Sequence, residues 1–317
     1  MTETKSYIFT VQPHERDNRL DKFLVEKLPE YSRNFFQNII SEKQVLLNGK
    51  PETKNRVLLK EGDVVELIFA SEDHCSDYQL LPEAIPLDII YEDDMILVIN
   101  KPRGLVVHPA AGHRSGTLAN ALLFHCEELN RDCNRDPIRP GIIHRLDKDT
   151  SGLLIAVKNA EAKNKYGALF ATRNIRKEYL AICVGKPTLS EIQTQILRDP
   201  LKRKEMTIDI DPNKGKTAIT HCEIITVKNP LSLVKLHPIT GRTHQLRVHL
   251  KYAKSPILGD PVYGCPKMNK SYGCEKQLLH AHKLSFHRIH DNKLVTFMAP
   301  CPEDMKLICS KHLAYVL

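Results

Sequence analysis

The stretch His144–Gly152, HRLDKDTSG, places one carboxylate, Asp147, shortly before the apolar run Leu153–Val157. We expect Asp147 to lie in a loop between two apolar strands, over 142–143 and 153–157, because scaffolds present reactive side chains on such loops. A carboxylate held against cationic neighbours stays ionised and can act as a nucleophile. The alternative is a loop cluster of salt bridges, the commoner fate of charged loops. This stretch alone leaves both interpretations open.

A second dense stretch, TGRTHQLRVH at Thr240–His249, follows about one hundred residues later and contains several basic side chains. It is expected to open a helix over 243–254, in which Thr243 and Arg247 share one face. The start of a helix carries partial positive charge, which suits a phosphate or a carboxylate. Together the two stretches offer an acid and several bases.

Histidines permit a metal interpretation that the pattern supports only weakly. His237, His244 and His249 have no accompanying acidic ligand, and their spacing does not match a usual zinc site. His280 and His282 alternate on a predicted strand, where packing or hydrogen bonding is the commoner role. The sequence therefore predicts no metal site.

Tyr179 begins an apolar strand in RKEYLA. A tyrosine in this place can stack on a planar ligand and exchange a proton with it. A half-buried strand tyrosine without a functional role is the commoner case.

Charge and composition restrict the class of protein. The 317 residues carry a formal net charge of +8, with 42% hydrophobic and 26% charged residues, as in ordinary globular proteins. This moderate excess of positive charge fits a polyanionic partner without requiring one. No apolar run approaches the length of a membrane span and the N-terminus lacks an apolar signal core, so a cytoplasmic protein without membrane contact is expected. The nine cysteines include no C-x-x-C pair, which favours reduced, structural thiols.

The pattern of elements predicts two domains of an α+β protein. Residues 1–16 are expected to be a lead-in, 17–70 a small unit of two helices and short hairpins, 71–87 a polar linker, and 88–317 a larger domain. Many strands with few helices, without strict alternation, argue against a doubly wound sheet. Strands are expected over 89–91, 95–100, 142–143, 153–157, 179–184, 191–197, 218–227, 231–237, 278–286 and 294–298, and helices over 159–173, 243–254 and 302–313.

The small unit carries basic side chains that could contact RNA, but its total charge is neutral. Over residues 1–70, seven lysines and four arginines balance eleven acidic residues. RNA binding would require the positive side chains to gather on one face, and a solvated surface is the alternative. The candidates are Arg33, Lys43, Lys50, Lys54 and Arg56.

Several motifs resemble those of one enzyme family, the RluA-type pseudouridine synthases. HRLDKDTSG is similar to the family signature that carries the essential aspartate. The other motifs follow in the family's order: RKEYLAICVG at 176–185, LHPITGRTHQLRVH at 236–249, SPILGDPVYG at 255–264 and QLLHAHKLSF at 277–286, with INKPRGLVVHPAAGHRSGTLANAL upstream at 99–122. The first 70 residues, with RLDKFL and VLLNGK, resemble an S4-like RNA-binding domain. The segment after Ser32 is poorer in basic residues than expected there.

The resemblance implies a pseudouridine synthase fold, with a large mixed, mainly antiparallel sheet flanked by helices and a small α/β S4-like domain at the N-terminus. It makes Asp147 catalytic, Tyr179 the active-site tyrosine, and Arg247 the arginine that pairs with the aspartate. It also implies a monomer that needs neither cofactor nor metal. Substrate-binding roles are expected for Arg145, Arg242, His244 and Gln245.

The expected activity is isomerisation of uridine to pseudouridine in RNA. The two-domain arrangement and the segment HPAAGH resemble those of family members that modify 23S ribosomal RNA, which implies this RNA or the large ribosomal subunit as the partner, with helix 69 as the target region. The alternative is another set of large-subunit uridines modified by related enzymes. Two other classes are disfavoured: an RNA-binding protein without catalysis, and a metal-dependent RNA hydrolase, which a chelator would inhibit.

Overall fold

The protein is described by a computed structural model that covers residues 4–28, 31, 33–70, 80–110, 113–126, 129, 140–202, 204–209 and 211–317. Its contacts divide the chain into two compact units, Met1–Ala84 with Leu122–Pro140, and Ile85–Ala121 with Gly141–Leu317. Most of the expected linker, 71–79, lies outside the described residues, and 80–88 have no regular secondary structure. The domain limits given above therefore remain predictions.

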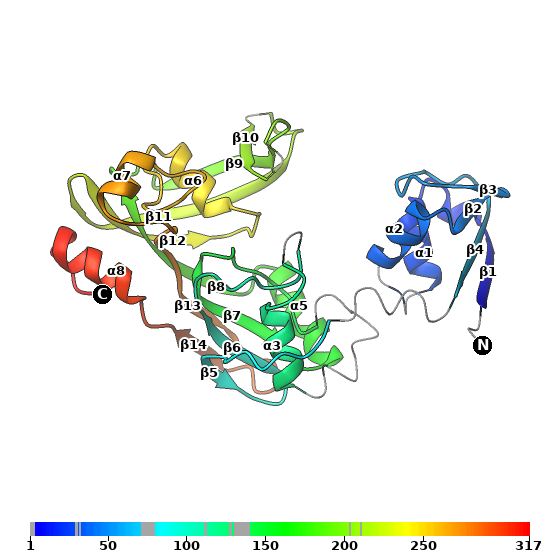
Figure 1. Ribbon diagram of the computed structural model, residues 1–317, viewed down its shortest axis with the longest axis horizontal. Coiled ribbons are helices and arrows are strands. Elements are labelled where there is room, and N and C mark those ends of the chain that lie inside the picture. The colour runs from blue at the N-terminus through cyan, green and yellow to red at the C-terminus, as the bar shows by residue number, and fades with distance from the viewer. Residues whose placement is uncertain are drawn as a thin grey trace. The chain divides into compact units, whose positions relative to one another are not determined.

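The small unit packs two helices against a short sheet (Figure 1). Apolar side chains at helical spacing on both helices meet inward-facing strand residues in one core, which includes Phe23, Phe36, Ile39 and Leu67. The sheet has the order β1-β4-β2-β3. Its elements are β1 (Thr4–Thr10), α1 (Leu20–Lys27), α2 (Arg33–Ser41), β2 (Val45–Leu47), β3 (Lys50–Pro51) and β4 (Val64–Ala70).

Strand β1 corrects the prediction of a lead-in over 1–16. Thr4–Thr10 pairs antiparallel with β4 along its whole length. Tyr7 and Phe9 pack on the core while Ile8 between them is 66% exposed, which is the two-residue alternation of a half-buried strand. With only two core-facing residues, the alternation is too short to stand out in the sequence.

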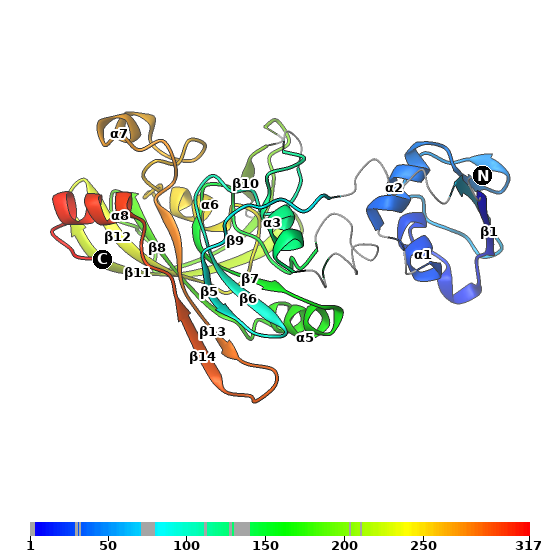
Figure 2. The same cartoon turned by 60° about the horizontal axis from the view of Figure 1, so that its bottom comes forward.

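The larger unit is built on a mixed, mainly antiparallel sheet of ten strands, as expected (Figures 1 and 2). The strand order is β10-β9-β11-β12-β8-β13-β7-β6-β5, with β14 paired to β13, and the pairing of β13 with β7 is parallel. The strands are β5 (Ile89–Glu92), β6 (Ile96–Lys101), β7 (Ser151–Val157), β8 (Arg176–Val184), β9 (Glu191–Arg198), β10 (Met206–Asp209), β11 (Lys216–Lys228), β12 (Leu231–Pro238), β13 (Leu279–His287) and β14 (Leu294–Met298).

Five helices follow residue 85 in the described part of the chain, and three of them were predicted within a few residues. The helices are α3 (Leu118–His125), α5 (Ala160–Ala171), α6 (Gln245–Tyr252), α7 (Pro266–Ser271) and α8 (Glu303–Ile308), followed by a π-helical turn at Cys309–Leu313. Helix α6 is buried along most of its length, and α5 is capped by Asn159, whose side chain accepts a hydrogen bond from the backbone N–H of Ala162. The expected strand over 142–143 is wrong, because Ile142 forms only an isolated bridge to Ala156.

Gly152 shows why the first motif ends in glycine. Strands β7 and β13 approach so closely here that a Cβ on Gly152 would lie 2.3 Å from the carbonyl oxygen of Ala281. Its φ of +106° is also a conformation that other residues avoid. The parallel pairing that joins the loop of Asp147 to the centre of the sheet therefore requires glycine at this position.

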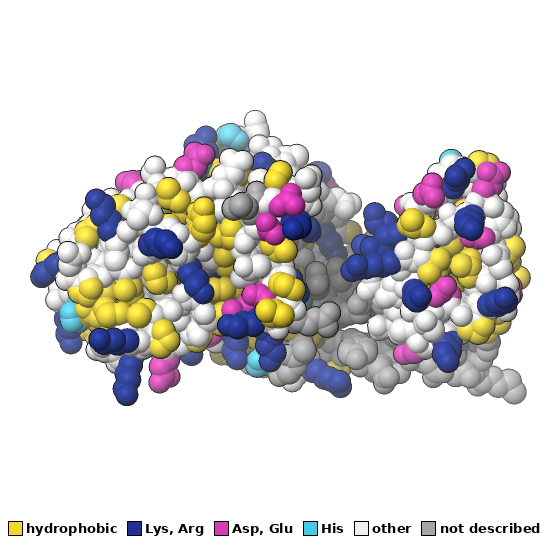
Figure 3. Space-filling model, turned by 90° about the horizontal axis from the view of Figure 1, so that it is seen from above, with side chains coloured by type: hydrophobic (Ala, Val, Ile, Leu, Met, Phe, Trp, Pro, Cys, Tyr) yellow, Lys and Arg dark blue, Asp and Glu magenta, His cyan; other side chains and the backbone are white. Residues whose placement is uncertain are grey.

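Lys and Arg side chains are spread over both units among acidic and hydrophobic ones on the face shown in Figure 3. No helix in the described part of the chain is long and apolar enough to span a bilayer.

Two fully buried histidines make the large unit sensitive to acid. Burial lowers the pKa of His249 and of His280 to about 4, from about 6.5 in an unfolded chain. Between these pH values the two histidines bind protons in the unfolded state but not in the folded state. The free energy of unfolding that is present above pH 6.5 is therefore lost as the pH falls toward 4. We expect each histidine to contribute a loss of roughly 1.4 kcal/mol per pH unit in this window, as an upper bound.

Chemical denaturation from pH 7.5 to 5 measures this loss. His249→Gln should flatten the pH dependence, and His287→Gln, at an exposed position without an ion pair among the described residues, is the control. Equal slopes in both variants would contradict the assignment.

Candidate active site

The loop that carries Asp147 is anchored at its first residue by His144. The Nε2 atom of His144 accepts a hydrogen bond from the backbone N–H of Ile155 at 2.8 Å, and the ring stacks on Phe170 at 4.3 Å. Burial, and then the charge of Lys177, lowers the pKa of His144 to about 3. The neutral ring is therefore a fixed part of the scaffold and ties the loop to β7.

Lys101 anchors the other end of the loop. Its fully buried ammonium donates to three carbonyl oxygens, those of Pro102, Leu105 and Lys148, at 2.8–3.0 Å. Burial lowers its pKa to about 8, against the opposing effect of Asp149 and Asp147. The three hydrogen bonds fasten the loop after β6 to the loop of Asp147.

Arg247 lies between two carboxylates, Asp147 and Asp260. Its Nη1 donates to Asp147 Oδ2 at 3.1 Å, while Nε and Nη2 donate to the two oxygens of Asp260 at 2.7 and 2.9 Å. The exposed fraction of the side chain rises from 0% at Asp260 to 6% at Arg247 and 20% at Asp147. A bidentate interaction with Asp260 therefore fixes the guanidinium of Arg247, and the third guanidinium nitrogen holds the more accessible carboxylate of Asp147.

The electrostatics of this trio follow from burial and pairing. Burial alone would lower the pKa of Arg247, but the hydrogen bond and charge of Asp260, followed by those of Asp147, raise it overall. Burial alone would raise the pKa of Asp260, but Arg247 and the backbone N–H groups of Tyr263 and Val262 lower it. Arg247 and Asp260 are therefore both charged inside the protein.

His244 is the second group beside Asp147. Its Nε2 lies 4.0 Å from Asp147 Oδ1, and its Nδ1 is 2.9 Å from the hydroxyl of Tyr263. That hydroxyl accepts the backbone N–H of Met206 at 2.7 Å, so its own proton is available for His244 Nδ1. Burial lowers the pKa of His244, against the raising effect of Asp147. With the Tyr263 hydroxyl as the donor to Nδ1, we infer that the neutral ring carries its proton on Nε2, toward Asp147.

A pocket of about 430 Å³, within the usual range for small-ligand sites, is lined by His144, Asp147, His244 and Arg247. Tyr179 also lines it, and burial, then the charge of Asp147, raises the pKa of its phenol. The walls come from the Asp147 loop, the end of α5, β8, and the segment from β12 into α6. Charged or basic side chains in the lining are His144, Arg145, Asp147, Arg173, Lys177, Arg242, His244 and Arg247.

Comparison with known proteins identifies the family. Residues 95–252 match the family model for RNA pseudouridylate synthase, and residues 18–65 match that of the S4 domain. Ribosomal large subunit pseudouridine synthase D of Neisseria meningitidis is 39% identical over 96% of this chain and 81% of its own. The chain belongs to the RNA pseudouridine synthase family.

Other relatives and solved structures agree with this membership. An uncharacterised RNA pseudouridine synthase of Bacillus subtilis is 39% identical over 93% of this chain and 94% of its own. The structure of human RNA pseudouridylate synthase domain containing 1 is 27% identical, with a TM-score of 0.54 over 69% of this chain and 84% of that chain. The expected fold and enzyme class are confirmed: the protein is an RNA pseudouridine synthase with an S4 domain.

The structure separates the expected substrate-binding residues of the synthase into two groups. Arg145 is exposed at the pocket and lies 3.2 Å from His108 Nε2. Arg242 donates from Nε to the carbonyl oxygen of Thr217 and also lines the pocket. With His244, both remain candidates for substrate contact.

Gln245 has a different role from the one expected. Its side-chain oxygen accepts from the Thr240 hydroxyl and the Arg242 backbone, and its amide nitrogen donates to Ile219 and Thr220. These four bonds use the whole hydrogen-bonding capacity of the buried amide. Gln245 therefore holds the start of α6 against β11, and although it lines the pocket, its amide has no hydrogen-bonding capacity left for a substrate in this arrangement.

The S4 unit of the synthase presents all five predicted RNA contacts as exposed side chains: Arg33, Lys43, Lys50, Lys54 and Arg56. Arg33 is different, because it donates two hydrogen bonds to the fully buried carboxylate of Asp21, which Arg19 and Gln37 also contact. Arg33 therefore joins α2 to α1, which leaves its guanidinium less available to RNA than expected.

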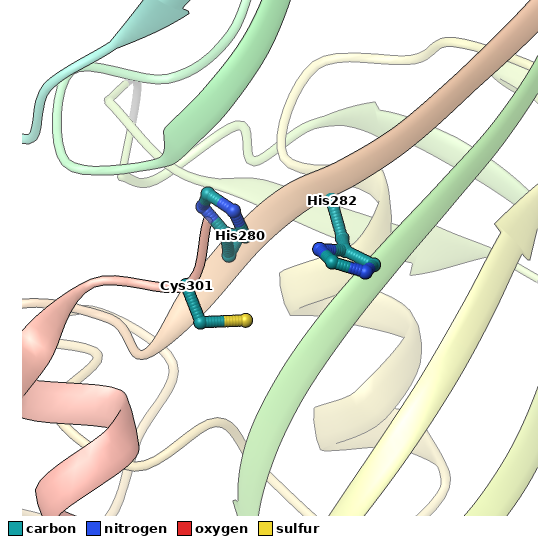
Figure 4. Close-up of side chains that lie close together, drawn as sticks. All are labelled: His280, His282 and Cys301. Carbon is teal, nitrogen blue, oxygen red and sulfur yellow. The ribbon is translucent and has the colours of Figure 1, made fainter. Parts of the chain in front are cut away.

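The histidines of the synthase fall into separate environments. Among the described residues, His237, His244 and His249 form no cluster of candidate ligands, and His249 is hydrogen-bonded to Thr194 and Thr220. His280, His282 and Cys301 do lie close enough to surround a metal ion (Figure 4).

Hydrogen bonds favour a structural role for that second cluster. His280 is bonded through Nδ1 to Ser151 and through Nε2 to the carbonyl oxygen of Ala299, which His282 also contacts. A metal ion would have to replace one of the His280 contacts. The two rings instead connect β13 to β7 and to the segment after β14.

Sequence reasoning missed Asp260, Tyr263 and Lys101 as parts of the site. Asp260 and Tyr263 stand in the quoted motif SPILGDPVYG, so the motif itself was the available signal. Lys101 stands in NKPRG with no local sign that it is buried. Two further cations that line the pocket, Arg173 and Lys177, were not singled out either.

Tyr263→Phe should release His244 from its fixed tautomer, because the phenylalanine can neither accept from Met206 nor donate to Nδ1. We expect kcat to fall about threefold to tenfold, the cost of a typical hydrogen bond. Tritium release from RNA labelled at uracil carbon 5 measures the rate. Nitrogen-15 NMR of the ring, assigned with His244→Gln, reports the tautomer, and Tyr252→Phe serves as an exposed control. A proton found on Nδ1 in the unaltered synthase would contradict this arrangement.

Proposed function

We propose that this synthase isomerises uridine in 23S ribosomal RNA of the large subunit, with helix 69 as its target region. Relatives named ribosomal large subunit pseudouridine synthase D, from Neisseria meningitidis and Escherichia coli, are 39% and 37% identical over more than nine-tenths of this chain. The combination of an S4 domain with the catalytic domain supports an RNA substrate of this kind. This substrate fits a monomer working in the cytoplasm.

The arrangement of Asp147 carries the chemical proposal. In the reaction, the bond from ribose carbon 1′ to uracil nitrogen 1 breaks, the base turns, and carbon 5 takes its place at carbon 1′. Carbon 5 loses a proton and nitrogen 1 gains one, so the formula is unchanged and no electrons are exchanged. Asp147, positioned by Arg247 at the accessible end of the trio, initiates the cleavage.

Tyr179 contributes as a neutral phenol. Because burial and Asp147 raise its pKa, the side chain keeps its proton and is a poor base in the resting site. It packs against the uracil ring and donates a hydrogen bond. Removal of the carbon 5 proton then needs an acceptor, and Asp147 is the carboxylate that lines the pocket.

The uridine must leave its stacked position to reach this pocket. Extruding a nucleotide costs a few kcal/mol, and less when the base is already in a loop. Arg145, which is exposed at the pocket, can occupy the vacated space and contact phosphates. A stem-loop is therefore a favourable substrate.

The target is tested with purified protein and unmodified 23S transcripts carrying tritium at uracil carbon 5. We expect tritium release from the full transcript and from the isolated helix 69 stem-loop. Pseudouridine mapping of ribosomal RNA from cells that lack the protein should show missing sites in the same stem-loop. Loss of pseudouridine only at other large-subunit sites would support the alternative target set, and no loss in ribosomal RNA would overturn the proposal.

A further inference from the structure

The pocket carries more positive charge than its carboxylates balance. Five cationic side chains line it, against the single carboxylate of Asp147. Arg247 is already paired with Asp147 and Asp260. Uracil and ribose are neutral, so the charge that could match the remaining cations on a uridine in RNA is its phosphate.

Lys177 and Arg173 are the two cations of the pocket for which the described part of the protein supplies no polar partner. Within the part of the chain that the structure describes, no hydrogen bond or ion pair of the Lys177 ammonium or the Arg173 guanidinium is found. By contrast, Arg242 bonds to Thr217 and Arg145 contacts His108. The Lys177 ammonium is half-buried, and a charge withdrawn from water without a partner is unfavourable, so an anionic ligand that supplies the partner would be stabilised there. Arg173 is exposed, so its guanidinium is open to the same ligand.

The strand places Lys177 on the side of the reacting base. Lys177 and Tyr179 are two apart on β8, so their side chains point to the same face of the sheet, and both line the pocket. Burial, and then the nearby charge of Arg173, lowers the pKa of Lys177. An anion between the two cations would relieve both effects.

Arg173 reaches the pocket from the end of α5. The backbone N–H of Arg173 bonds to the carbonyl of Phe170, and that of Asn174 to the carbonyl of Leu169, with Arg173 at a φ of +62°. This Schellman motif places Arg173 at the position where glycine is preferred. Helix α6 ends in the same motif, with Lys254 at the equivalent position and a φ of +60°, but Lys254 does not line the pocket.

We propose that Lys177 and Arg173 form a phosphate subsite of the pocket, which holds a backbone phosphate of the extruded uridine. The inference rests on the proposed reaction on RNA but not on which uridine is the target. The two side chains bind the charged backbone while Tyr179 and Asp147 act on the base and sugar. They are therefore binding residues whose loss weakens the capture of RNA rather than the chemical step.

Two substitutions separate RNA binding from folding. Lys177→Met removes an unpaired charge while keeping a long apolar side chain, and Arg173→Gly installs the residue that the backbone favours. Both should therefore leave the melting temperature unchanged or raise it. Both variants should raise KM on the tritiated 23S transcript, about tenfold for Lys177→Met. Their kcat should stay within about threefold of that of the unaltered protein, because the loss of uniform binding leaves the chemical step unchanged.

The salt dependence of binding identifies the lost contact as a phosphate. The logarithm of the affinity falls linearly with the logarithm of the salt concentration. For each variant this line should become less steep by about 0.7, the value for one lost phosphate contact to a single strand. Arg176→Met, on the opposite face of β8, and Lys254→Gly, at the matched helix end, are the controls. Both should keep the KM and the salt slope of the unaltered protein.

The outcomes distinguish the two proposals. If the unaltered protein releases tritium and both variants keep its KM and salt slope, the subsite is wrong. If kcat falls instead of KM rising, the two side chains act in the chemical step and the subsite is again wrong. If the unaltered protein releases no tritium from the transcript, the proposed substrate fails, while binding of an unrelated single-stranded RNA still tests the salt slope.

Discussion

Asp147→Asn should abolish pseudouridine formation while RNA still binds. The amide keeps the shape of the carboxylate and can still accept a hydrogen bond, but it has no charge with which to attack or accept a proton. We expect tritium release to fall at least about a thousandfold, as when an essential catalytic group is removed. The rate of tritium release and the affinity for 23S transcript, measured on the same preparation, separate chemistry from binding.

The geometry explains why this variant should remain folded. Arg247 keeps both hydrogen bonds to Asp260 when the charge at position 147 is lost, so no buried cation is left without a partner. Asp147 is also 20% exposed, so the neutral amide remains partly solvated. The melting temperature should therefore change little. Asp94→Asn, at an exposed position outside the pocket lining, is the control and should retain the activity.

A rate for Asp147→Asn within tenfold of the unaltered protein would remove Asp147 from the mechanism. Loss of RNA affinity together with activity would instead indicate that the carboxylate organises the binding surface.

The reacting side chains were predictable from sequence because each stands in its own local motif. Asp147, Tyr179 and Arg247 were found this way, and the structure brings all three to one pocket. Local patterns also predicted most strands of the large sheet, since apolar runs and alternation are properties of neighbouring residues. Strand β1 was missed because its pairing with β4 joins residues about sixty positions apart.

The supporting groups were not predictable in the same way. That Lys101 is buried depends on three carbonyl groups, one of them at Lys148, far along the chain. That Gln245 is fully bonded depends on β11, which no pattern around Gln245 reports. A polar side chain in a motif can serve substrate or scaffold, and only its partners in space decide between the two.

Arg247→Lys tests whether the planar guanidinium, rather than positive charge alone, organises the site. Arg247 holds Asp260 with two nitrogens and Asp147 with the third, and it lies 5.0 Å from the centre of the Tyr263 ring. One ammonium cannot reproduce a fork that spans two carboxylates. We therefore expect kcat to fall about a hundredfold, because Asp147 loses its fixed position.

Stability should fall in the same variant. Asp260 is fully buried, and a lysine that reaches it only partly leaves a buried carboxylate with incomplete pairing. Disturbing a buried ion pair in this way is expected to reduce the free energy of unfolding by about 2–4 kcal/mol. Urea denaturation measures this change alongside the rate of tritium release.

Arg288→Lys is the matched control, because Arg288 also binds an aspartate, Asp291, through two nitrogens, but outside the pocket. That pair is more exposed to solvent, so its loss should change stability by less than about 1 kcal/mol and leave the rate unchanged. If Arg247→Lys also keeps its rate, a point charge suffices beside Asp147. The fork to Asp260 would then serve folding alone, and the alignment of Asp147 would have to come from His244 and the loop anchors.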